Sequence, residues 1–205
     1  MLKPYIIGIA GGTGAGKSTL ARALQTEFGA SCQILVCDNY YKSVPVRSKT
    51  PWLYFNFDNP DSLDLAWFAK NLFELKAGQP TIAPVYDFKT HTRAPNTVTL
   101  SPCPIIIAEG ILLFHLETIR KICDYKIYVD LDESERFRRR LARDIRERGR
   151  TEESVLGQYK TSVKPMHDLY VEPTKTYADE VFSGANDDKQ VEALVKRLRF
   201  LMKIT

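Results

Sequence analysis

A glycine-rich octapeptide near the N-terminus carries the clearest chemical signal. Gly11-Gly12-Thr13-Gly14-Ala15-Gly16-Lys17-Ser18 matches the pattern G-x-x-x-x-G-K-[ST]. In such a loop, backbone N–H groups converge on phosphate oxygens and the following helix adds its positive N-terminal end. Lys17 can then reach the β- and γ-phosphates of a nucleotide, and the Ser18 hydroxyl can ligate Mg²⁺. A chance glycine-rich turn is the alternative, but the flanking strand and helix patterns favour a phosphate-binding loop that extends to Thr19.

Two acids occupy positions that this chemistry would use. Asp38 directly follows an apolar run at 33–37, and Glu109 directly follows another at 105–108. Ligands of open α/β sheets bind beyond the carboxyl ends of the strands. One acid could orient Mg²⁺ and the other could accept a proton from an attacking hydroxyl. Solvated carboxylates at strand ends are the alternative, and the phosphate-binding loop favours the functional interpretation.

Eight arginines lie between Arg136 and Arg150, against only Asp144 and Glu147. This segment carries a net charge of +6 and the whole chain +4, so the remaining residues sum to −2. One arginine-dense element favours a local anionic ligand over a long polyanion. The distribution counts against a nucleic-acid-stimulated ATPase and predicts no nucleic-acid partner.

Arginine donors would stabilise the negative charge that phosphoryl transfer gathers on the γ-phosphoryl oxygens. Helical spacing places Arg136, Arg140 and Arg143 on one face. A basic lid that closes over ATP would use such a face and exclude water. For most of these arginines a solvated helix face remains the alternative, and about two or three would touch a ligand.

Strand and helix patterns alternate along the chain. Buried strands are predicted at 5–10, 33–37, 105–108, 126–129 and 180–182. Helices are predicted at 18–28, 61–77, 152–163 and 188–202, with an arginine-rich helix after a capping box at Asp132 and Glu135. An ordered loop is predicted at 38–60, and a hairpin from strands 81–86 and 97–101 joined by a long loop. The alternation implies an α/β fold of the P-loop NTPase type, a parallel sheet core covered by helices on both faces, with a small β-hairpin and an arginine-rich lid.

Bulk properties favour one soluble domain. A length of 205 residues fits a single domain over 1–205, with a hairpin insert at about 80–101 and a lid at about 133–165. The four cysteines show no C-x-x-C spacing, which favours reduced thiols over a zinc site. The N-terminus lacks a signal-peptide pattern and no apolar run is long enough for a bilayer, so a cytoplasmic protein without a membrane partner is expected.

Beyond these separate signals, an ordered set of motifs resembles the uridine/cytidine kinase family from about residue 5 to about 182. The set begins with GIAGGTGAGKST at 8–19, DNYY at 38–41 and NFDNPD at 56–61. It continues with PVYDF at 84–88 followed by His91 and Arg93, then AEGIL at 108–112, RDI at 143–145, ERGR at 147–150 and QY at 158–159. Related kinases share the phosphate-binding loop but not the hairpin motif.

The resemblance implies roles for residues at the reacting groups. Asp38 would be the base for a nucleoside 5′-hydroxyl, close to Mg²⁺. Ser18 and Glu109 would complete the metal environment. Arg143 and Arg148 would belong to the lid and bind the phosphates of ATP or GTP.

The resemblance also implies a nucleoside pocket. Asp58 and Arg140 would hold the ribose hydroxyls. Tyr86 and His91 would recognise the pyrimidine edge, with Arg150 nearby. Three aromatic side chains would pack around the sugar and base: Phe57, Phe88 and Tyr159.

The chain departs from the family pattern in two segments. Residues 43–54 lack the expected charged helical pattern, and 183–186 replace an Ile-Pro-x-Gly stretch. These departures concern loop conformation and subunit contacts; homotetramers are common in the family. A related kinase, such as a phosphoribulokinase or a pantothenate kinase, is the alternative within the same class, and the hairpin with His91 counts against both.

Overall fold

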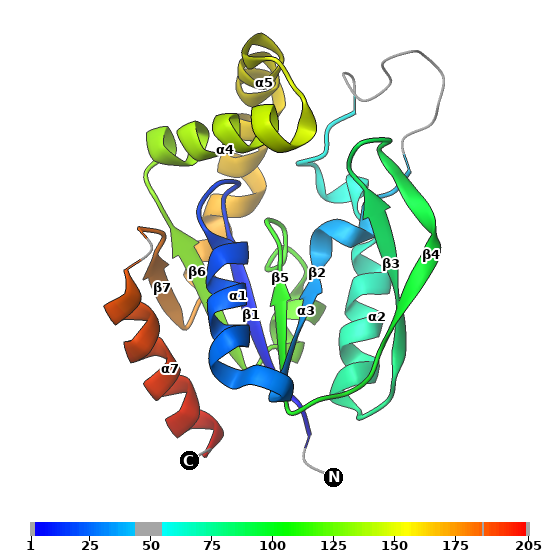
Figure 1. The fold of residues 1–205 in the computed structure, drawn as a ribbon, viewed down its shortest axis with the longest axis vertical. Coiled ribbons are helices and arrows are strands. Elements are labelled where there is room, and N and C mark those ends of the chain that lie inside the picture. Colours follow the sequence, from blue (N-terminus) through cyan, green and yellow to red (C-terminus); the bar gives the residue numbers. More distant parts are fainter. Residues whose placement is uncertain (1–2, 44–54, 186, 204–205) are drawn as a thin grey trace.

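Five parallel strands form the central sheet of the computed structural model, which describes residues 3–43, 55–185 and 187–203. The strand order is β2-β5-β1-β6-β7, and every neighbouring pair is parallel. The carboxyl ends of the strands point towards α4 and α5 (Figure 1). The strands are β1 Tyr5–Gly11, β2 Cys32–Val36, β5 Ile105–Glu109, β6 Tyr125–Asp130 and β7 Glu180–Ser183.

The two central strands are buried on both faces, which explains why their sequences are apolar without alternation. Alternate residues of β1 and β5 enter different cores. Ile6 and Ile106 pack with α2 and α3, whereas Ile7 and Ile107 pack with α1 and α7. Helices therefore cover both faces of a parallel sheet, and the predicted fold class is confirmed.

The helices lie close to the predicted positions, with some additions. The α-helices are α1 Lys17–Phe28, α2 Leu65–Lys76, α3 Glu117–Ile122, α4 Glu133–Arg148, α5 Glu152–Gln158, α6 Lys164–Met166 and α7 Asp188–Met202. The six-residue α3 was not predicted. The helical path becomes π-helical at Tyr159–Val163. It then continues beyond the predicted end at 163, through α6, a second π-helical turn at His167–Val171 and a 3₁₀ segment at Glu172–Tyr177.

One predicted helix start was wrong, and one predicted capping box forms only in part, because side chains cap the backbone differently from the expected pattern. The predicted helix at 61–77 begins only at Leu65, after a 3₁₀ turn at Pro60–Ser62, because the Asp64 carboxylate accepts from the Trp67 N–H. At α4 the Asp132 carboxylate accepts from the Ser134 N–H. Glu135 instead binds two arginines of its own helix, so the reciprocal half of the predicted capping box does not form.

A separate antiparallel hairpin, β3 Thr81–Asp87 and β4 Thr92–Leu100, lies beside α2 (Figure 1). The second strand begins at Thr92 and not at the predicted Thr97, so a short turn replaces the predicted long loop. Much of β4 is exposed, and it therefore lacks the alternation that marks a half-buried strand.

Part of the predicted loop at 38–60, and most of the atypical segment at 43–54, lie outside the described residues. In the described ranges, no helix combines the length and apolarity needed to cross a membrane.

Candidate active site

The predicted phosphate-binding loop connects β1 to α1 at the carboxyl edge of the sheet. Gly11 and Gly14 adopt φ angles of 138° and 76°, and a Cβ at either position would collide with the backbone of Val129 or Arg136. These two positions therefore require glycine. Lys17 is buried, and its Nζ donates to the Gly12 carbonyl at 2.9 Å. Burial lowers the pKa of Lys17, although the charges of Glu109 and Asp38 oppose the shift.

Both predicted acids lie next to this loop. Glu109 is the last residue of β5, and its carboxylate accepts a hydrogen bond from the Ser18 hydroxyl at 2.8 Å. Strand register pairs Val36 with Glu109, and Asp38 follows two residues later in a 3₁₀ turn at Cys37–Tyr40. Burial raises the pKa of Glu109, opposed by the charge of Lys17. A hydroxyl and two carboxylates are the hard oxygen donors that Mg²⁺ takes alongside nucleotide phosphates, so these residues fit that ion.

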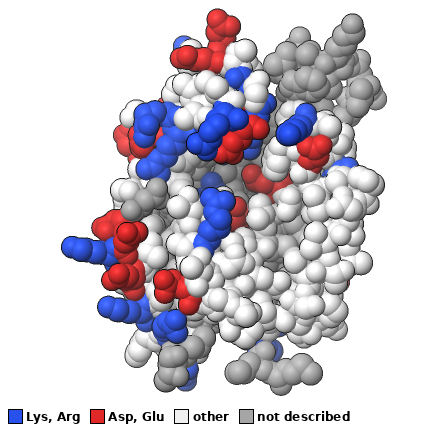
Figure 2. All heavy atoms as spheres, in the orientation of Figure 1, with Lys and Arg blue, Asp and Glu red and all other residues white. Residues whose placement is uncertain are grey.

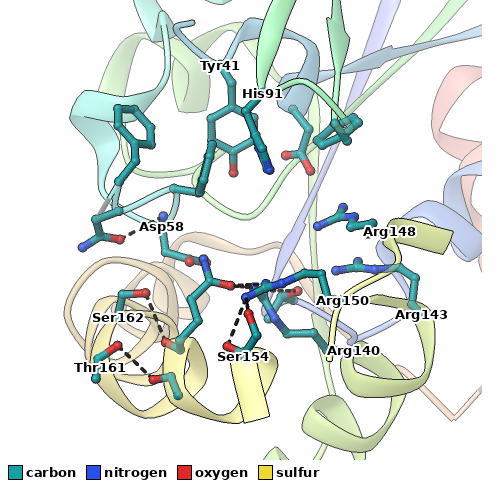
Figure 3. A pocket seen from close by; sticks show the side chains of 18 of the residues that line it. Tyr41, Asp58, His91, Arg140, Arg143, Arg148, Arg150, Ser154, Thr161 and Ser162 are labelled. Atoms are coloured by element: carbon teal, nitrogen blue, oxygen red, sulfur yellow. Dashed lines mark hydrogen bonds between the residues drawn. The ribbon is translucent and has the colours of Figure 1, made fainter. Parts of the chain in front are cut away.

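A cavity of about 850 Å³ opens beside Thr13 of the loop. Tyr41 and His91 lie on one side of it, and an arginine group faces them from the other (Figure 3). The cavity brings together many of the residues assigned from the sequence: Asp38, Phe57, Asp58, Phe88, His91, Arg140, Arg143, Arg148 and Arg150. Segments from the loop after β2, the hairpin turn, α4 and the residues after it thus meet at one site.

Tyr86 and Tyr159, which were also assigned to the pocket, are not among the residues that line the cavity. Tyr86 is buried behind the cavity, with its ring 5.5 Å from that of Tyr41 and 5.1 Å from that of Phe88. Its hydroxyl has no hydrogen-bond partner among the described residues. Tyr159 packs against Phe137 at 4.7 Å. Tyr86 could reach a ligand through its hydroxyl, whereas Tyr159 supports the helix that forms one wall.

Asp58 is the most unusual acid of the cavity. It is only 5% exposed, and its Oδ2 accepts no hydrogen bond within the described part of the chain. Burial raises its pKa, and the charge of Arg140 opposes that shift. Arg140 also donates to Thr13 Oγ1 at 3.1 Å, so the arginine whose charge acts on Asp58 contacts the phosphate-binding loop as well. A buried carboxylate oxygen without a donor is suited to a ligand hydroxyl.

His91 lies at the tip of the hairpin in a left-handed conformation with φ 56°. Its ring lies 5.0 Å from the Phe57 ring at an angle of 36°. Burial lowers the pKa of His91, and the charges of Arg148 and Arg150 lower it further, so the imidazole is neutral at pH 7. A neutral imidazole offers one donor and one acceptor to a ligand.

Arg93 docks this hairpin onto the segment that carries Asp38. Its guanidinium donates to the carbonyls of Tyr41 and Tyr40 at 2.9 and 3.0 Å and lies 5.1 Å from the Trp67 ring. The two parts of the cavity, the hairpin tip and the turn after β2, are therefore held in a fixed relation.

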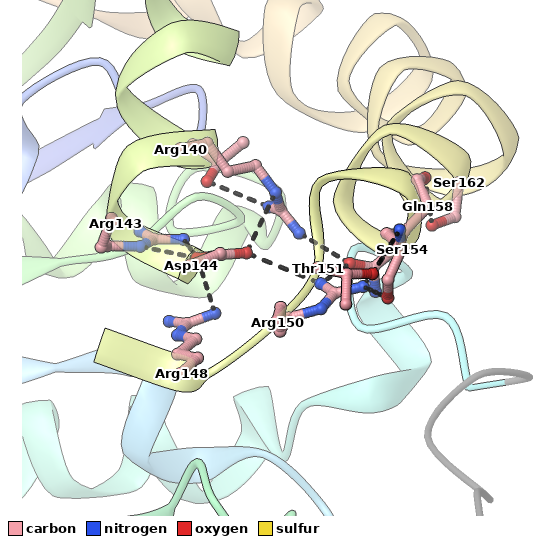
Figure 4. Close-up of polar contacts among 10 residues, drawn as sticks. Arg140, Arg143, Asp144, Arg148, Arg150, Thr151, Ser154, Gln158 and Ser162 are labelled. Carbon is pink, nitrogen blue, oxygen red and sulfur yellow. Dashed lines mark hydrogen bonds and ion pairs between the residues drawn. The ribbon is translucent and has the colours of Figure 1, made fainter. Parts of the chain in front are cut away.

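Basic side chains gather over α4 in the upper part of the face shown in Figure 2, with acidic ones among them. Four arginines of this group surround the buried carboxylate of Asp144 (Figure 4). The sequence singled out the arginines but assigned no role to Asp144. It also gave no role to Gln158, whose amide oxygen accepts from Arg140 and Arg150. The signal that could have identified Gln158 was its place in the QY motif beside the arginine segment.

The fold and the site together define a P-loop kinase. Two solved kinases share the fold. Phosphoribulokinase from Rhodobacter spheroides has a TM-score of 0.66 and 15% identity, and the match covers 88% of this chain and 70% of that one. D-glycerate 3-kinase from Cryptococcus neoformans has a TM-score of 0.63 and 16% identity, and the match covers 91% of this chain and 88% of that one. Residues 6–190 match the phosphoribulokinase/uridine kinase family, and the chain belongs to it. Uridine kinases from Lactobacillus helveticus and a Geobacillus species are 40% and 41% identical to it over 98% of this chain and 96% of theirs.

Proposed function

We propose that this enzyme transfers the γ-phosphoryl group of ATP to the 5′-hydroxyl of uridine or cytidine, giving UMP or CMP. The observation that carries the proposal is one cavity lined by Thr13 of the phosphate-binding loop, Asp38, and His91 of the hairpin. Curated relatives named uridine kinase at about 40% identity over nearly the whole chain support the same substrate class.

In the proposed reaction, Asp38 accepts the proton of the nucleoside 5′-hydroxyl as that oxygen attacks the γ-phosphorus, and the bond from the γ-phosphorus to the β,γ-bridging oxygen breaks to release ADP. Arg143 and Arg148 donate to the phosphoryl oxygens, where negative charge accumulates. Lys17 binds the β- and γ-phosphates. Ser18, Glu109 and Asp38 are the residues that would hold Mg²⁺, which supplies positive charge to the nucleotide phosphates when bound.

In this proposal the enzyme recognises both the ribose and the pyrimidine base of the nucleoside. Asp58 and Arg140 bind the ribose hydroxyls; this assignment is supported by the buried Oδ2 of Asp58, which has no donor among the described residues. His91 and Tyr86 recognise the pyrimidine edge, with Arg150 nearby, while Phe57 and Phe88 pack against the rings. A neutral imidazole serves either the C4 carbonyl of uracil or the C4 amino group of cytosine by a change of tautomer.

The family resemblance supports the remaining details of the proposal. ATP is the phosphate donor, with GTP as the alternative. The enzyme works in the cytoplasm as a homotetramer, and the segment from α4 to residue 165 closes as a lid over the donor.

An acceptor panel tests the proposal. ADP release with Mg-ATP should be fast with uridine and cytidine, and slow with adenosine and guanosine. Turnover with ribulose 5-phosphate or pantothenate in place of the pyrimidine nucleosides would replace the proposed function with that of a related kinase. A filter-binding assay with RNA and DNA tests the nucleic-acid alternative at the same time, and retention of nucleic acid at physiological salt would favour it.

A further inference from the structure

The clustering of four cations around one acid is the feature of the lid that most needs explanation. Asp144 lies on α4 with its side chain 0% exposed. Arg143 Nε and Nη2 donate to its Oδ1 at 2.9 and 2.7 Å. Guanidinium nitrogens of three further arginines lie 3.5–3.6 Å from its carboxylate oxygens: Arg140, Arg148 and Arg150.

Asp144 also shapes the backbone that brings these arginines together. Its carbonyl oxygen accepts from the N–H of Gly149 and, at 3.2 Å, from the N–H of Arg150. Gly149 takes the left-handed conformation with φ 64°, which ends α4 and turns the chain back. Arg150 is thereby returned to the side of α4 that carries Arg140 and Arg143 (Figure 4).

The carboxylate of Asp144 is ionised despite its burial. Burial acts to raise its pKa, but the charges of Arg140, Arg143 and Arg148 outweigh burial and hold the pKa below its usual value. Four guanidinium groups in one cavity repel one another, so an ionised carboxylate at their centre offsets that repulsion. The contacts of Arg140, Arg148 and Arg150 with Asp144 are longer than hydrogen bonds, so the carboxylate groups these arginines by charge without occupying their N–H donors. Arg140 and Arg150 direct several of those donors to Thr13, Gln158 and Ser154.

We infer that Asp144 is a positioning residue for phosphoryl transfer: its carboxylate holds Arg140, Arg143, Arg148 and Arg150 together, so that a nucleotide triphosphate meets an assembled set of donors. The inference rests on the proposed function for its kinetic readout. Asp144 lies in a segment where the sequence assigned functional roles only to arginines.

The test compares Asp144→Asn with Glu147→Gln in the full-length enzyme. Both changes remove one negative charge from α4, but Glu147 is exposed and pairs with Arg146. We expect Asp144→Asn to lower kcat/KM for ATP by about 10- to 100-fold, since small misplacements of catalytic groups reduce rates on this scale. Glu147→Gln should remain within about twofold of the wild type. Equal kinetics in the two variants would overturn the inference.

A double-mutant cycle separates positioning from a merely structural effect. If Asp144 acts through its arginines, the loss of kcat/KM caused by Asp144→Asn should be clearly smaller in an Arg143→Lys background than in the wild type, because one of the four positioned arginines is already lost. The same 10- to 100-fold loss in both backgrounds would show a structural role and refute positioning. Should Asp144→Asn fail to fold, Asp144→Glu displaces the carboxylate by one methylene, and wild-type activity in that variant would refute the inference.

A binding measurement keeps this inference separate from the proposed function. Inorganic tripolyphosphate is titrated against a fluorescent ATP analogue bound to the wild type and to Asp144→Asn, with no nucleoside present. Positioning predicts about tenfold weaker tripolyphosphate binding in the variant, because the arginines are no longer assembled. Unchanged or tighter binding, as expected from loss of a negative charge alone, would overturn the inference. A wild type that phosphorylates no nucleoside would refute the proposed function and leave this binding test intact.

Discussion

The 2′-hydroxyl of the nucleoside offers a direct test of the role proposed for Asp58. The perturbation is removal of that hydroxyl, by comparing uridine with 2′-deoxyuridine. In the cavity, Asp58 is 5% exposed and its Oδ2 accepts no hydrogen bond from the described residues. A bound ribose would supply the missing donor, and a deoxyribose would leave this oxygen unpaired.

The magnitude follows from the burial of the carboxylate. An unpaired buried polar group costs about 1–3 kcal/mol, which corresponds to a factor of roughly 5–150 in kcat/KM. Arg140 offsets part of the charge of Asp58, since it lowers a pKa that burial raises. We therefore expect a discrimination of about 10- to 30-fold, near the middle of that range.

The assay measures kcat/KM for both nucleosides with the wild type and with Asp58→Asn and Asp58→Ala. Asp58→Asn keeps the volume and one acceptor oxygen but loses the charge, so discrimination should shrink. Asp58→Ala should abolish most of it. Equal values of kcat/KM for the two nucleosides in the wild type would refute the assignment, as would full discrimination retained in Asp58→Ala.

Three further predictions concern other residues of the site and the histidines. Asp38→Asn should keep ATP binding, measured by titration, but lower kcat by about 10²–10⁴-fold, the usual effect of removing a general base; near-normal turnover would exclude Asp38 as the base. His91→Phe should weaken uridine and cytidine alike by about 1–3 kcal/mol, with His91→Asn as the control for turn strain because Asn tolerates the left-handed φ of 56°; unchanged kinetics would remove His91 from the pocket. Burial is the largest cause that lowers the pKa values of all three histidines, His91, His115 and His167. Near the ordinary histidine pKa of about 6.5 the unfolded chain therefore binds more protons than the folded chain, and the free energy of unfolding should fall as the pH drops from about 7.5 through 6.5. Urea titrations that show a constant or rising free energy of unfolding across that window would contradict the burial of the histidines.

The sequence predicted the parts of this fold whose signals are local. The phosphate-binding loop was predictable because eight consecutive residues combine glycines that let the backbone approach phosphate, a lysine that can bind phosphate and a serine that can ligate Mg²⁺. β1 and β5 were predictable because burial on both faces leaves a continuous apolar run. The second hairpin strand was misplaced because β4 is largely exposed and shows no alternation.

The relations within the site were less predictable, because they depend on contacts between distant segments. In the sequence, Asp144 was part of the RDI motif and an acid that reduces a positive charge, with no role of its own, whereas in the structure four arginines surround it. The contact between Arg140 and Thr13 spans 127 residues. Tyr86 and Tyr159 were assigned from motifs, and the cavity lining includes neither, since each packs against other aromatic rings.

The position of the phosphate on the product shows which hydroxyl the enzyme phosphorylates. Uridine is incubated with Mg-ATP and the enzyme, and the new phosphomonoester is examined by proton-coupled ³¹P NMR. Transfer to the 5′-hydroxyl predicts a triplet, because the phosphorus then couples to the two 5′ protons, together with one ADP for each UMP formed. A doublet, which marks a phosphate on the 2′- or 3′-oxygen, or ADP released without any phosphorylated nucleoside, would contradict the account.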